Sequence, residues 1–200
     1  IPWTVTSFMG VMDDKRVIDD TLLWGFRLNF QPFDGLEVGL TRLAQFGGKD
    51  RSQSLSTFFN VLVGKDNCGA SGLDCGVNKE NEPGNQQAGY DLRYSFNVLN
   101  TPIGLYGQYF AEDGDNSGSS LSFLTEPKVQ VGIDTNLKIF SAHTKVYLEY
   151  TDTYADCADI DNRNIGNCYY EHHIYQTGMR YQQRTLGNLY DNDATSVVLG

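Results

Sequence analysis

The sequence predicts an all-β protein, an antiparallel transmembrane β-barrel of the outer-membrane type, and three observations support this fold class. Apolar and polar residues alternate in about nine segments. The connections between these segments are long and short in turn. No run approaches the roughly 18 apolar residues that a membrane-spanning helix needs. The 200 residues are also rich in glycine, tyrosine and phenylalanine (21, 12 and 11), a composition that favours β structure.

Each predicted strand has one apolar and one polar side. In the clearest case, Trp24, Phe26, Leu28 and Phe30 alternate with smaller or polar residues. Successive side chains of a strand point to opposite faces, so this pattern predicts a sheet with two different faces. The other alternating segments cover residues 36–41, 90–96, 103–109, 128–134, 143–150 and 175–182, with a less regular one at 3–12 and one beginning at 195.

The polar side of these strands carries charges of both signs. The residues expected on it are Arg27, Glu37, Asp91, Arg93, Lys128, Asp134, His143, Lys145, Glu149 and Arg180. A dry protein core would not hold so many charges, because each buried and unpaired charge is costly. We therefore expect the charged side to line a water-filled lumen and the apolar side to face lipid. A soluble β-sandwich is the alternative.

The lengths of the connections favour the barrel. The long ones cover about residues 13–21, 46–86, 113–126 and 153–171, and the short ones about 32–35, 97–102, 136–141 and 184–194. Outer-membrane barrels have long loops at one end and short turns at the other. Bacterial barrels close with an even number of strands, so about nine strands indicate part of a larger wall. We expect residues 1–200 to be part of one transmembrane domain, cut from a longer chain.

One short helix is predicted inside the second long loop. Leu55, Phe58, Phe59 and Leu62 recur with helical spacing within residues 52–64. Ser52 or Ser54 can cap its start and Gly64 its end. The apolar side of this helix has to pack on something, so the helix either closes its own loop or enters the lumen.

Four cysteines indicate an oxidising compartment. Cys68 and Cys75 lie close in sequence, as do Cys157 and Cys168, and local pairing is the simplest of the three connectivities. Free thiols or a zinc site are the alternatives, and the spacings do not match those of a zinc knuckle. Disulfides form in exported proteins.

Charge and motifs exclude other functions. A net charge of -10 makes nucleic acid an unsuitable partner. Neither a catalytic motif nor a phosphate-binding loop occurs, so we expect no enzyme, no catalytic residues and no cofactor. Residues 113–118 begin like a calcium loop, but the twelfth position is Leu124 and not glutamate, so we expect no metal either.

The long loops combine aromatic rings with planar polar groups, as sugar-binding sites do. Rings stack on the faces of sugars, and amide or guanidinium groups donate hydrogen bonds to their oxygens. The candidates are Arg51, Phe58, Phe59, Lys65, Asn67, Tyr154, Arg163, Tyr169 and Tyr170. Ordinary surface loops also have this composition.

Several segments resemble the Wzi family of capsule assembly proteins. They include residues 25–32 (GFRLNFQP), 82–86 (EPGNQ), 88–95 (AGYDLRYS) and 186–193 (LGNLYDND), and the similarity runs from about residue 24 to 194. The resemblance implies an outer-membrane lectin of capsulated Gram-negative bacteria, with a barrel of about 18 strands, an even number within the range of bacterial barrels. This chain would then supply about half of that barrel.

The function expected from the sequence is binding of capsular polysaccharide, which helps attach or assemble the capsule at the cell surface. A porin-like diffusion channel is the alternative, and an outer-membrane enzyme acting on lipid or glycan is the third. The expected partners are capsular or other surface polysaccharide, outer-membrane lipid and lipopolysaccharide. A monomer in the bacterial outer membrane is the expected state.

Overall fold

The computed structural model describes residues 1–65, 68, 73, 75–77, 81–112, 128–154, 157–158, 164–165 and 169–200. The predicted site residues Asn67 and Arg163, the predicted disulfide partner Cys168 and the loop at 113–126 lie outside the described residues, and of Cys157 only the backbone is described.

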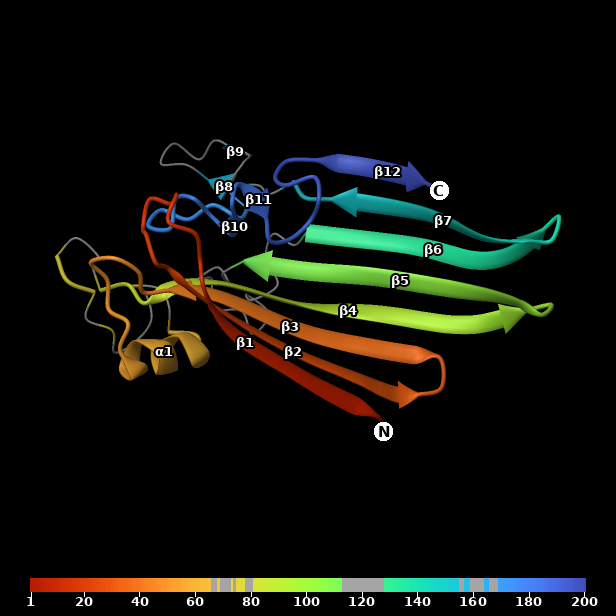
Figure 1. Ribbon diagram of the computed structural model, residues 1–200, viewed down its shortest axis with the longest axis horizontal. Coiled ribbons are helices and arrows are strands. Elements are labelled where there is room, and N and C mark those ends of the chain that lie inside the picture. The colour runs from red at the N-terminus through yellow and green to blue at the C-terminus, as the bar shows by residue number, and fades with distance from the viewer. Residues whose placement is uncertain are drawn as a thin grey trace.

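Eight strands of the described chain form one antiparallel sheet in the order β1-β2-β3-β4-β5-β6-β7-β12 (Figure 1). They are β1 (Trp3–Val11), β2 (Leu22–Phe33), β3 (Leu36–Phe46), β4 (Gly84–Val98), β5 (Thr101–Glu112), β6 (Lys128–Ile139), β7 (Ala142–Asp152) and β12 (Thr195–Leu199). Two further two-stranded sheets pair β8 (Cys157–Ala158) with β9 (Asn164–Ile165) and β10 (Arg180–Tyr181) with β11 (Arg184–Thr185). The predicted all-β class is confirmed.

Tight turns join the strands at one end of the sheet. Leu99 and Asn100 connect β4 to β5, and Phe140 and Ser141 connect β6 to β7, all with positive φ. Two successive residues with positive φ match the twist of a β-hairpin. Gly35, with φ of 86°, allows the equally short turn from β2 to β3. The other ends of these strands, at the opposite end of the sheet, are joined by connections of ten residues or more.

Most of the apolar face of the sheet is exposed. Large apolar residues of five successive strands are exposed there: Leu40, Tyr90, Leu92, Tyr94, Leu105, Val131, Ile133, Leu148 and Tyr150. The described residues place no second sheet against this face. A surface of this extent is far larger than a soluble monomer exposes, so it favours a face turned to lipid over a sandwich.

The strand predicted over residues 175–182 is wrong. Gly178 adopts a φ of 70°, and Gln182 and Gln183 turn the chain back, so only Arg180–Tyr181 is extended. Tyr175 and Met179 alternate with polar residues because they enter a core, not because they face lipid. The whole stretch from β7 to β12 is therefore one long connection, in which the predicted short turn at 184–194 is included.

Residues 169–194 pack on the polar face of the sheet, and we name them the covering segment. Tyr169, Tyr170 and Met179 form a buried cluster against Leu23 of β2, Leu43 of β3 and Phe110 of β5. Backbone contacts add to this packing. The carbonyl oxygen of Gly178 accepts hydrogen bonds from Arg16 Nη2 (2.9 Å) and from Gln45 Nε2 (2.8 Å). The covering segment is thereby fixed to the wall and to the first long connection.

The helix α1 (Leu55–Leu62) lies on the other face. Its start is capped by Ser54, whose hydroxyl accepts from the Thr57 N–H at 3.1 Å. Val61 and Phe58 pack against Ala44 and Phe46 of β3, on the apolar side of the sheet. The expectation that the helix might enter the lumen is therefore wrong, because its apolar residues meet the outer side of the wall.

Arg42 of β3 completes the end of α1. Its guanidinium donates to the carbonyl oxygens of Val61 (2.7 Å) and Leu62 (2.8 Å) in the last turn, where carbonyl groups lack the usual donors of a helix; the Gly64 N–H also donates to Val61 at 3.1 Å. Among the described residues, no helix has the length and apolar character needed to cross a membrane.

The predicted Cys68–Cys75 disulfide is formed, with Cα atoms 5.6 Å apart. It closes a short loop between α1 and β4, which restricts the unfolded chain.

Replacing Met179 by alanine tests how the covering segment is held. Met179 is fully buried, so Met179→Ala should weaken the docking of the segment by about 2–5 kcal/mol. Hydrogen exchange of residues 169–194 in the full-length protein should become faster. Met9→Ala on the exposed outer face is the matched control. Equal exchange in the two variants would contradict the packing described here.

Candidate functional site

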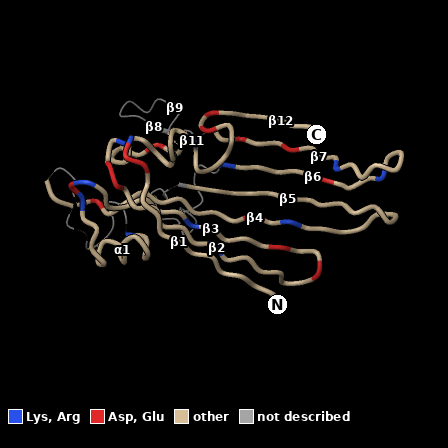
Figure 2. Tube along the Cα trace, viewed as in Figure 1, with Lys and Arg blue, Asp and Glu red and all other residues tan. Residues whose placement is uncertain are grey.

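The polar face of the sheet carries charges that pair across three strands. Arg27 of β2 binds Asp91 of β4 through two hydrogen bonds of 2.7 and 2.9 Å. Arg93 of β4 binds Asp134 of β6 in the same way, at 2.9 and 2.8 Å. Tyr106 of β5 donates to Glu149 of β7 at 2.9 Å. Figure 2 shows residues of both charge signs along these strands.

Each of these pairs passes over a glycine of the strand between. A Cβ atom on Gly39 would lie 2.4 Å from Arg27 Nη2 and from Asp91 Oδ2, and one on Gly104 would lie 2.3 Å from Arg93 Nη2. Gly132 lies under the ring of Tyr106 in the same manner. Strands two places apart are separated by about 9.5 Å, so the side chains can meet only if the middle strand leaves the space free.

Most residues predicted to face the lumen lie on this polar face. Arg27, Glu37, Asp91, Arg93, Lys128, Asp134, His143, Lys145 and Glu149 occupy alternate positions of β2 to β7 on the side covered by residues 169–194. Lys145 lies 3.9 Å from Asp134, which joins it to the Arg93 pair.

Arg180 does not lie on a strand of the wall, and its lumen-facing role stays a prediction. It belongs to the covering segment, where its guanidinium contacts Asp191 (2.9 Å) and Glu171 (2.7 Å). Burial on its own would lower the pKa of Arg180, but hydrogen bonds to Asp191 and Glu171 outweigh it and raise the pKa. Arg180 therefore stays charged and fixes the shape of the segment.

A cavity of about 510 Å³ lies between the polar face and the covering segment. The wall contributes amide, hydroxyl and carboxylate groups, among them Gln108, Gln130 and Glu149, and the ring of Tyr147. The covering segment contributes Tyr169, Tyr170 and residues 186–190. A second recess of about 490 Å³ lies further along the same face, around the Arg27–Asp91 pair and Tyr106.

Two of the predicted sugar-binding residues line this cavity, and a third, Tyr154, contacts the lining residue Lys128 through its backbone oxygen. Tyr169 and Tyr170 line it, with their rings in an edge contact at 4.5 Å between centroids. Lys128 Nζ lies 4.5 Å from the centre of the Tyr169 ring and donates to the Tyr154 carbonyl oxygen at 2.7 Å. Tyr170 is largely structural, since it is buried and its hydroxyl accepts from the Asn188 N–H.

The other described candidates lie elsewhere. Phe58 packs on Trp24 and Phe46 on the apolar face, while Phe59 is 59% exposed and contacts the ring of Phe58. Lys65 follows α1 and is exposed. Arg51 donates to the backbone oxygen of Glu82 and lies over the ring of Tyr175. These residues do not share one site with Tyr169, so their role in sugar binding stays a prediction.

Sequence reasoning did not single out Gln108, Gln130 and Tyr147. Their alternation with apolar neighbours placed them on the polar face, but it gave no sign that a segment about 20–60 residues further along the chain would fold over them. That signal exists only in the tertiary contacts of residues 169–194.

An antiparallel sheet with a lipid-exposed face, a charged opposite face and loops sorted by length defines part of an outer-membrane β-barrel. The family description "capsule assembly protein Wzi" matches residues 2–200. The chain therefore belongs to the Wzi family of capsule assembly proteins.

Two relatives agree with this assignment. A protein from Klebsiella pneumoniae, known as an uncharacterized 55.8 kDa protein in the cps region, is 35% identical over 113 residues, which are 56% of this chain and 21% of the relative. A solved structure of Wzi from Escherichia coli, described as an outer membrane protein involved in group 1 capsule assembly and a carbohydrate binding beta-barrel, matches 98% of this chain with a TM-score of 0.71 and 29% identity. This chain covers 37% of that structure. The expected barrel wall and outer-membrane location are confirmed.

The glycines beneath the charge pairs can be tested by substitution in β5. Gly104→Val should separate Arg93 from Asp134 and lower the free energy of unfolding by about 1–3 kcal/mol. Valine has a higher strand propensity than glycine, so propensity alone would predict that the substitution raises the free energy of unfolding.

Gly107→Val is the control in the same strand. A Cβ atom there meets nothing closer than 3.4 Å, so the change should be neutral or slightly stabilising. Urea unfolding of the full-length protein, followed by tryptophan fluorescence, measures both variants. A Gly104→Val protein as stable as Gly107→Val would contradict the crossing-pair interpretation.

Proposed function

We propose that this chain forms part of an outer-membrane lectin that binds capsular polysaccharide, and that the cavity under the covering segment contributes a saccharide subsite. Membership of the Wzi family and the description of the E. coli relative as a carbohydrate binding barrel support the first part. The single observation that carries the second is the cavity itself, where tyrosine rings lie beside amide and carboxylate groups.

The chemistry of the lining suits a sugar. Gln108 and Gln130 offer amide donors and acceptors, Glu149 offers acceptors, and the ring of Tyr147 offers a flat apolar face. Sugar hydroxyls need both donors and acceptors, and the C–H faces of sugar rings need apolar contact. Lys128 adds a positive charge that suits an acidic polysaccharide.

Binding without turnover is the role we infer for this part of the protein. The binding description of the E. coli relative supports it, as does the use of the polar face for charge pairs. Outer-membrane lipid and lipopolysaccharide are the proposed neighbours of the exposed apolar face, and the proposed state is a monomer. The covering segment lies across the long-loop end of the polar face, which favours a lectin over an open diffusion channel.

The test is binding of purified capsular polysaccharide to the full-length protein in detergent. Tyr147→Ala and Gln130→Ala should each weaken binding about tenfold, which corresponds to about 1.4 kcal/mol, the scale of one lost ring or hydrogen-bond contact. Isothermal titration calorimetry gives the dissociation constants.

Tyr150→Ala provides the matched control. Tyr150 lies in the same strand, β7, but on the apolar face, and its loss should leave the affinity unchanged. If Tyr147→Ala and Tyr150→Ala bind the polysaccharide equally well, the cavity is not a saccharide subsite, although the protein could still be a lectin through other loops.

A further inference from the structure

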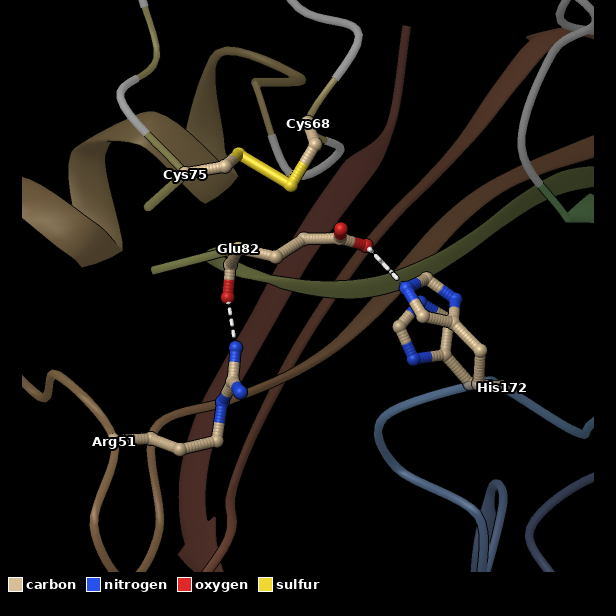
Figure 3. Close-up of a disulfide and its surroundings, with 6 residues drawn as sticks. Arg51, Cys68, Cys75, Glu82 and His172 are labelled. Carbon is tan, nitrogen blue, oxygen red and sulfur yellow. Dashed lines mark hydrogen bonds and ion pairs between the residues drawn. A yellow bond between two sulfur atoms is a disulfide. The ribbon is translucent and has the colours of Figure 1, made fainter. Parts of the chain in front are cut away.

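Three side chains of metal-ligand type lie where the covering segment meets the beginning of β4. Glu82 comes just before this strand, and His172 and His173 belong to the segment. Nε2 of His173 is 3.3 Å from Glu82 Oε1, and Nε2 of His172 is 3.7 Å from the same oxygen. Figure 3 shows the Glu82 carboxylate directed at the imidazole rings. The three ligand atoms lie within 4.8 Å of one another, close enough for one ion to bind all three after small shifts, since such bonds are about 2.0–2.2 Å long.

The Glu82 carboxylate is buried without a hydrogen-bond donor. Its side chain is 1% exposed, and in the described part of the chain neither oxygen has a hydrogen bond. Nε2 of His172 is likewise buried and without one. The nearby Arg51 donates to the backbone oxygen of Glu82 and not to its carboxylate. A buried carboxylate in this condition is costly and calls for a cation.

The His172 ring is neutral, because its Nδ1 accepts hydrogen bonds from the N–H groups of Ile174 and Tyr175 at 3.2 Å and so carries no proton. Neutral imidazole is the form that binds metal ions. Glu171, the other carboxylate of this region, already contacts Arg180 at 2.7 Å, so the cluster has Glu82 as its own negative charge.

We propose that Glu82, His172 and His173 bind one divalent transition-metal ion, with zinc as the best match. Two imidazole nitrogens and one carboxylate oxygen are the ligand set of zinc sites that keep a fourth position open, whereas calcium and magnesium prefer oxygen ligands alone. A surface recess of about 350 Å³, lined by His172, His173, Glu171 and Gln176, leads to this position. Water can complete the coordination there.

Binding of the metal ion requires the proton of His172 to move from one ring nitrogen to the other. In the metal-free protein, the N–H groups of Ile174 and Tyr175 point at His172 Nδ1 from 3.2 Å, so the proton of the neutral ring is on Nε2. The ion takes the place of this proton, which passes through water to Nδ1, and the two long N–H contacts are given up. Glu82 binds as the carboxylate, and His173 binds through an unprotonated Nε2.

The site would tie two long connections together. Glu82 ends the connection that contains α1 and the Cys68–Cys75 disulfide, while the histidines belong to the segment that covers the polar face. A bound ion therefore fixes the covering segment to the wall at a second point, besides the core around Met179. The sequence by itself predicted no metal, because the ligands lie about 90 residues apart and match no spacing motif.

The test is zinc binding by the untagged full-length protein in detergent, after treatment with a chelator. Calorimetry should give one zinc ion per chain, and zinc should raise the melting temperature. Glu82→Gln and His173→Gln should each weaken binding at least about tenfold and remove the thermal shift. Cobalt should give visible absorption bands with the natural protein and lose them in both variants.

His143→Gln is the matched control, because His143 is an exposed histidine of β7 outside the cluster. Its zinc affinity should equal that of the natural protein. His173 is 53% exposed, so His173→Gln should not disturb folding and still tests the proposal if Glu82→Gln fails to fold. Zinc affinity unchanged within twofold in His173→Gln, or no zinc bound by the natural protein, would overturn the proposal.

Discussion

The rest of this structure depends on the pairing of charges across three neighbouring strands. A wall with one face in lipid must place its polar residues on the other face, and there opposite charges need partners within reach. The pairs Arg27–Asp91 and Arg93–Asp134 meet this need over Gly39 and Gly104. Glycine weakens a strand, and here the crossing of two charged side chains over it offsets that loss. The register of β2 to β7 is thereby linked across the sheet as well as along each ladder.

At the end with the long connections, different elements pack on the two faces of the wall. The helix α1 packs on the apolar side through Val61 and Phe58, whereas the covering segment packs on the polar side through Tyr170 and Met179. Both α1 and the covering segment are held to the wall by apolar side-chain contacts. The protein at this end therefore has three layers. The polar face is not an open surface here, because the covering segment encloses a cavity against it.

This arrangement accounts for how a barrel wall can hold a saccharide. Charged groups on the polar face are mostly satisfied by each other, so they give the wall rigidity, while amides and rings such as Gln130 and Tyr147 are left to contact a ligand. The proposed zinc site lies at a separate recess, where Glu82 and the paired histidines would fix the covering segment to the beginning of β4. Affinity for sugar and affinity for metal are separate properties and can be measured separately.

The sequence by itself determined the class of fold, since alternation with a period of two assigns the face of nearly every residue in strands β2 to β7, and a wall in lipid leaves no other arrangement for it. The helix cap at Ser54 and the Cys68–Cys75 pair were also local and predictable. Only the tertiary structure decided that Tyr175 and Met179 enter a core and not a ninth strand, because alternation cannot tell lipid from a protein interior as the apolar partner. The cavity and the Glu82–His172–His173 cluster were decided in the same way, since their residues come together only when the chain folds back across its own wall.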